Sequence, residues 1–247
     1  MGNGNQAPPL ELARLAGGLT FQPQFTFNQR RREAADEIND ELTKVSPSNT
    51  WSHRGFEVAL VGEDKVRIRH LKHQGWSALV SESDIYFRYD SPTREALPET
   101  LRVQTELFAR LTARLNVRPV RSIGIKFVAL KSGSGISIGE TAKLLMPSAI
   151  RSGEGFGAVG TAPSEVTLRV AYPILQGAAS ASLQLGLDAE TDTFVLDLDC
   201  ACRDSFAMPT DHLEFFTVCA DHYTEVEQQI VADLLQLPSS QPKTALQ

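Results

Sequence analysis

The stretch Val117–Leu130, VRPVRSIGIKFVAL, lies at the middle of the 247-residue chain and decides the fold that the sequence predicts. Apolar side chains alternate with polar or small ones, which is the period of a strand with one buried face. The alternating residues are Ser122, Ile123, Gly124, Ile125, Lys126 and Phe127. Gly124 leaves the polar side of this strand bare at one point, which permits close approach of a neighbour or a ligand.

The patterns before and after this central strand follow one order of elements. The first set is a strand at 19–27, a helix at 29–45, strands at 56–61, 66–70 and 80–89, and a long helix at 94–116. The second set, after the central strand, is a helix at 139–150, strands at 165–172, 181–188 and 193–203, and a long helix at 209–237. Each half therefore reads strand, helix, three strands, helix, which predicts a pseudo-duplicated α+β fold.

We expect the two halves, 19–116 and 117–237, to form one compact unit between a flexible start (1–18) and a flexible tail (238–247). The strands should build a largely antiparallel, twisted sheet or sheets, with the long helices on one face. The other face would then remain uncovered, as a broad and shallow concavity.

Composition narrows the class of partner. The net charge of −6 and the pI of about 5.4 disfavour a duplex nucleic acid, whose binding needs a positive surface. No apolar run is long enough to span a bilayer, and the start lacks the features of a signal peptide. An odd count of 3 cysteines fits a reducing compartment. We therefore predict a cytoplasmic protein with neither a nucleic acid nor a membrane as its partner.

Motifs for cofactors and metals fail on their context. The GxGxxG at 155–160 has no strand before it and Pro163 soon after it, so it is interpreted as a loop. Cys219 and His222 are three apart on a predicted helix, but no further ligands stand at a suitable spacing. Cys200 and Cys202 alternate with polar residues on a strand and are expected in the core. No metal, cofactor or catalytic residue is predicted from these motifs.

The polar sides of several strands would meet on the uncovered face. Guanidinium groups there could bind carboxylates, and the acids could bind amines or backbone N–H groups of an extended peptide. The predicted peptide-binding residues are Arg67, Arg69, Tyr86, Arg88, Lys126, Arg169, Asp197 and Asp199. The plainer alternative is a solvated face with weak cross-strand ion pairs. The second functional hypothesis is an enzyme that acts on a bound peptide or small molecule, in which Asp197 and Asp199 serve as acid and base or bind a metal.

The strands Ser122–Phe127 and Leu196–Asp199 together resemble a sporadically distributed family of uncharacterised bacterial proteins of similar length. That family has a central Arg-Ile-Gly-Leu-Arg-Tyr strand, a late Leu-Asp-Ile-Asp strand and a helix with a histidine, to which His222 would correspond. Ser122 and Lys126 stand where the family has arginines. Some similar chains accompany crocagin-type pathways, so the resemblance implies an accessory protein that holds a precursor peptide for modification. A homodimer is a further expectation, and a plain oligomeric scaffold is the third hypothesis for the function.

Overall fold

The computed structural model describes residues 10–24, 27, 29–45, 51, 55–117, 119–132, 165–188, 190–203 and 212–230. The described strands are β1 (Glu11–Phe21), β2 (Phe56–Val61), β3 (Lys65–His70), β4 (Trp76–Val80), β5 (Asp84–Asp90), β6 (Val120–Ser132), β7 (Glu165–Ile174), β8 (Ala179–Asp188) and β9 (Thr193–Cys202). The described α-helices are α1 (Arg31–Leu42), α2 (Leu97–Arg114) and α6 (His212–Ile230), and a short 3-10 turn, η2, covers Leu175–Gly177.

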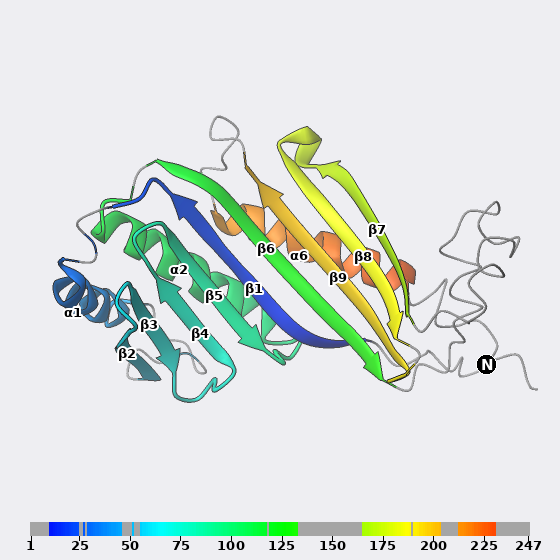
Figure 1. Ribbon diagram of the computed structural model, residues 1–247, viewed down its shortest axis with the longest axis horizontal. Helices are drawn as coiled ribbons and strands as arrows, with labels where there is room; N and C mark the ends of the chain where they lie inside the picture. Colours follow the sequence, from blue (N-terminus) through cyan, green and yellow to red (C-terminus); the bar gives the residue numbers. More distant parts are fainter. Residues whose placement is uncertain are drawn as a thin grey trace, which may run out of the picture.

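All nine strands form one sheet in the order β2-β3-β4-β5-β1-β6-β9-β8-β7, and every neighbouring pair is antiparallel. Figure 1 shows α2 and α6 lying behind the sheet, on one of its faces, with α1 beyond the β2–β3 end. The opposite face, toward the viewer, carries none of the described helices. The α+β class and the placement of the long helices on one face are confirmed.

The core lies between this sheet and its helices. The predicted alternation in β6 is confirmed, since Ile123, Ile125 and Phe127 are buried and their neighbours are not. The Phe127 ring stacks on Tyr223 of α6, with 4.7 Å between the ring centroids. Burial of one aromatic side chain stabilises the fold by roughly 2–3 kcal/mol, so such contacts fix the helices on this face.

The repeat in element order is also a repeat in space. The first strands of the two halves, β1 and β6, pair with each other at the centre of the sheet. Each is flanked by the last strand of its own half, β5 or β9, and then by the preceding strands in reverse order. The halves are therefore related by a pseudo-twofold axis between β1 and β6, where Gly18 pairs with Gly124. β2 has no counterpart among the described strands of the second half.

The first strand begins earlier than its pattern suggested. β1 is Glu11–Phe21, whereas we predicted a strand at 19–27 and a flexible segment at 1–18. Its buried leucines, Leu12 and Leu15, are three apart, and the register shifts between Leu12 and Arg14. This irregularity breaks the period of two, so the start of the strand does not look like one in the sequence.

The first half also has one strand more than predicted. The strand predicted at 80–89 corresponds to β5, and the separate strand before it, β4, was not predicted, so four strands follow α1 in this half. The turn between them is Ser81-Glu82-Ser83, and the Ser81 hydroxyl accepts the N–H groups of Ser83 and Asp84. We did not predict this turn from the sequence, because the turn contains neither glycine nor proline. The predicted helix at 139–150 and the loop at 155–160 lie outside the described residues.

Candidate functional site

The sheet face that carries none of the described helices, called the open face below, gathers the residues predicted to bind a peptide. Residues directly opposite each other on antiparallel strands point to the same side of a sheet. One such row runs across six strands, through Arg69, Ser77, Arg88, Ala16, Lys126 and Asp199. Parallel rows contain the other predicted residues, Arg67, Tyr86, Asp197 and Arg169. The alternating neighbours on these strands, such as Ile68, Phe87 and Leu198, are buried under the helices.

One cluster on this face is already paired. The Arg88 Nε donates to both carboxylate oxygens of Asp90 at 2.9 Å, and the Arg14 Nε donates to Asp90 Oδ1 at 3.2 Å. Burial alone would raise the pKa of Asp90, but the hydrogen bonds from Arg88 and Arg14 outweigh it and lower that pKa. Arg88 is therefore engaged by a neighbouring acid on its own strand and is less available to a ligand than its exposure suggests.

A second cluster, on β6 and β9, is only half paired. Lys126 lies directly opposite Asp199, but its Nζ contacts Asp197 Oδ2 at 2.7 Å instead. Within the described part of the chain, Asp199 makes no side-chain hydrogen bond and no ion pair. The Arg169 Nε, farther along the same face, donates to the Ser182 hydroxyl at 3.0 Å. Lys126 therefore forms its ion pair with Asp197 and not with Asp199, the residue directly opposite it in the sheet.

The arginines of β3 also keep their charge unpaired. Arg69 is exposed, and neither it nor Arg67 has an ion-pair partner among the described residues. The Arg67 Nε is buried and has no hydrogen-bond acceptor in the same part of the chain. The other N–H groups of these guanidiniums can donate to a carboxylate or carbonyl of a ligand. Among the residues predicted to bind a peptide, the unpaired charges are therefore cationic on β3 and anionic on β9.

Between these charges lies a shallow pocket of about 450 Å³. Its floor is the glycine pair Gly18 and Gly124, and Tyr86, 40% exposed, stands beside it. The remaining lining residues are Ala16, Gly17, Leu19, Thr20, Asp84, Ile85, Ser122, Ile125, Lys126 and Asp199. The bare spot at Gly124 was predicted, whereas its partner Gly18 was missed. Two adjacent glycines at 17 and 18 were the available signal.

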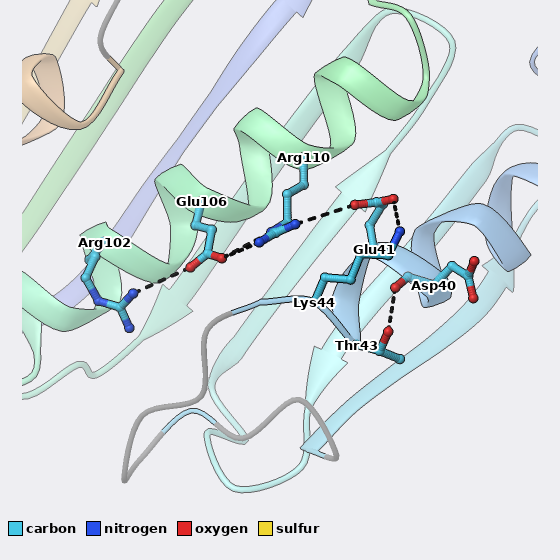
Figure 2. Close-up of polar contacts among 7 residues, drawn as sticks. All are labelled: Asp40, Glu41, Thr43, Lys44, Arg102, Glu106 and Arg110. Carbon is cyan, nitrogen blue, oxygen red and sulfur yellow. Dashed lines mark hydrogen bonds and ion pairs between the residues drawn. The ribbon is translucent and has the colours of Figure 1, made fainter.

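A different charged region, the ion-pair ladder, lies on the helix side (Figure 2). Arg102 and Arg110 of α2 contact the Glu106 carboxylate at 3.5 and 2.9 Å. Arg110 also contacts Glu41 of α1 at 3.8 Å, and Lys44 contacts Glu41 at 2.7 Å. Because each charge of the ladder meets an opposite one, it joins α1 to α2 and leaves no group for a ligand.

The structure describes both residues that were considered for a metal, Cys219 and His222. Cys219 is buried, while the His222 Nε2 hydrogen-bonds the Tyr172 hydroxyl at 2.8 Å. No group of three or more metal-ligating side chains occurs among the residues that the structure describes. Cys200 and Cys202 are buried, as predicted. No described helix is both long enough and apolar enough to traverse a bilayer.

The comparisons with known proteins add no identity to this geometry. No protein-family model matches the chain, and no curated protein matches it. The functional argument therefore depends on the open face itself, on its unpaired charges and on its central pocket.

Proposed function

We propose that this protein binds an extended peptide on the open face of its sheet. The observation that supports this best is the distribution of unpaired charge, with Arg67 and Arg69 on β3 and Asp199 on β9. An extended chain offers carboxylates and carbonyls to the arginines, and amines or N–H groups to the aspartate. The glycine-floored pocket between them gives room for a side chain of the peptide.

The dimensions suit a short segment. β3 and β9 are separated by five strand intervals in the sheet order. At about 4.8 Å per interval the unpaired charges are roughly 24 Å apart, a span that about seven residues of extended peptide would cover. A peptide lying across the strands could therefore meet both charged regions at once.

In this proposal the peptide is a ribosomally made precursor, held for modification in a bacterial natural-product pathway, as the family resemblance implies. The protein would act in the cytoplasm as an accessory protein of this pathway. It would assemble as a homodimer. The enzymatic alternative has weaker support, because Asp197 is engaged by Lys126 and leaves one free carboxylate where acid and base would need two.

The test is selection of linear twelve-residue peptides from a random display library on the immobilised protein. The strongest binder is then measured against an Arg67→Ala/Arg69→Ala variant by fluorescence anisotropy. We expect its affinity to fall at least about tenfold, since two charge-assisted hydrogen-bonding groups are lost. The matched control is Arg102→Ala/Arg114→Ala, which removes two arginines from α2 on the other side, and it should change affinity less than about twofold. Failure to enrich any peptide, or equal binding by both variants, would refute the proposal.

A further inference from the structure

The two halves differ at the pseudo-twofold axis in a way that bears on the ligand. Gly18 and Gly124 face each other across the axis, so Thr20 and Lys126, each two residues farther along, are equivalent positions. Asp84 lies opposite Thr20, and Asp199 lies opposite Lys126. Asp84 and Asp199 are therefore counterparts, and both line the central pocket.

The counterpart carboxylates have different surroundings. Asp84 Oδ2 accepts hydrogen bonds from the Ser81 hydroxyl at 2.7 Å and the Ser83 hydroxyl at 3.3 Å, so it belongs to the turn between β4 and β5. Asp199 has no such donors in the described part of the chain. The Asp84 carboxylate therefore stabilises a turn, whereas the Asp199 carboxylate remains able to accept hydrogen bonds from a ligand.

The balance of charge at the pocket is negative although the face as a whole is rich in arginine. The pocket lining contains Asp84, Asp199 and Lys126, and the lysine charge is taken by Asp197 just outside it. The nearest guanidinium on β5, that of Arg88, is held by Asp90. A cation entering this pocket would therefore meet a free carboxylate and no competing positive charge that lacks a partner.

We infer that the central pocket binds a cationic side chain, a guanidinium or a primary amine, with Asp199 as its acceptor. The exposed ring of Tyr86 stands at the same pocket and can contact the cation or its aliphatic stem. The identity of the ligand as part of a peptide depends on the proposed function, but the preference for a cation can be tested without it.

The absence of a side chain at Gly124 supports the binding of a ligand group there, because the packing of the sheet strictly requires glycine only at position 18. A Cβ on Gly18 would lie 2.5 Å from the Ile85 carbonyl oxygen, so a side chain there would disturb the sheet. A Cβ on Gly124 would lie 3.3 Å from the Cys200 oxygen and 3.7 Å from the Ala201 Cβ, which small adjustments can accommodate. Alanine at position 124 therefore narrows the pocket with a much milder contact than the same change at position 18 would make.

The experiment is an NMR titration of the ¹⁵N-labelled protein with N-acetyl-arginine methylamide, following the Gly18 and Gly124 amides. We expect saturable shifts, and at least about tenfold weaker binding by Asp199→Asn, which loses a charge-assisted hydrogen bond. Gly124→Ala, which narrows the pocket, should weaken the shifts of the Gly18 amide, and a thermal midpoint close to that of the wild type shows that the fold is kept. The control variant is Glu57→Gln, which removes an acid of the same face outside the pocket and should bind normally.

A neutral probe separates charge recognition from shape. N-acetyl-citrulline methylamide has nearly the same shape without the charge and should not bind. If it binds as well as the arginine compound, or if Asp199→Asn binds arginine normally, the cation site is refuted. That result would leave peptide binding through Arg67 and Arg69 intact, so failure of the cation site can be told apart from failure of the proposed peptide-binding function. Conversely, Asp199-dependent arginine binding with no selected peptide would refute only the proposed peptide ligand.

Discussion

The helix layer and the open face use the same residue types in opposite ways. In the helix layer, Glu106 has two arginine partners, and Glu227 on α6 pairs with Arg94 near the start of α2. On the open face, Arg69 and Asp199 have no partner among the described residues. This difference shows that the presence of arginines and acids does not by itself distinguish a stabilising ion-pair network from a ligand-binding surface. The state of pairing does, because only an unpaired group gains a hydrogen bond when a ligand arrives.

This contrast makes the two regions separable by mutation. A change in the helix layer breaks contacts that exist in the folded protein, so it should lower the free energy of unfolding and leave ligand binding alone. A change at an unpaired residue of the open face removes nothing from the folded state. It should lower ligand affinity and leave the free energy of unfolding almost unchanged.

The largest effect on stability is expected for Glu227→Gln. Only 4% of the Glu227 side chain is exposed, and both its oxygens accept hydrogen bonds from Arg94, which raise the pKa of the guanidinium. Loss of one partner of a buried ion pair costs about 3 kcal/mol or more, and because the Arg94 side chain is 35% exposed and partly solvated we expect about 2 kcal/mol here. Urea denaturation measures this, with Glu225→Gln, an exposed acid of the same helix, as the control. A loss below about 1 kcal/mol would show that the pair is not integral to the fold.

A smaller effect is expected for Glu106→Lys in the ion-pair ladder. The change removes two i,i+4 contacts, to Arg102 and Arg110, and places a third cation between them. We expect a loss of about 1 kcal/mol in the free energy of unfolding, because exposed pairs of this kind contribute only a few tenths each. The loss should shrink in high salt, which screens the repulsion. Peptide and arginine binding should be unchanged, and a loss of either would contradict the separation of the two regions.

The sequence predicted the parts of the fold that depend on short-range periodicity. The central strand β6 and the long helix α2 were found because Ile123 and Ile125 alternate, and because Leu107 and Leu111 recur at helical spacing. The start of β1 was missed, since its bulge interrupts the alternation near Arg14. Local pattern carries no information about such a shift, which arises from pairing with a strand more than a hundred residues away.

The candidate site, like the fold, could be predicted from the sequence only in part. Strand parity was enough to predict that the eight candidate residues share one face. It could not tell which of them are paired, because Lys126 lies opposite Asp199 yet contacts Asp197, a choice made by side-chain geometry and not by register. The equivalence of Asp84 and Asp199 was also hidden, since their strands belong to different halves and show their correspondence only around the Gly18–Gly124 axis.

The smallest effect is expected for Asp199→Asn, and its comparison with Asp90→Asn sharpens the contrast within the open face itself. Hydrogen bonds from Arg88 and Arg14 leave the pKa of Asp90 below its ordinary value despite the opposing effect of burial. Its contribution to stability is therefore present above the ordinary carboxyl pKa of about 4 and is lost as pH falls through the lower folded value. Asp90 is half exposed, so this contribution should be only about 0.5 kcal/mol.

Acid unfolding curves measure the difference. Asp90→Asn should start less stable near neutral pH and converge with the wild type in acid, because the protonated wild type has lost the same ion pairs. Asp199→Asn should follow the wild-type curve at every pH and show none of the loss expected for Asp90→Asn near neutral pH, since the carboxylate has no partner to lose in the described part of the chain. If Asp199→Asn instead destabilised the protein as much as Asp90→Asn, its carboxylate would already be paired in the free protein. It would then not be available to a cationic ligand.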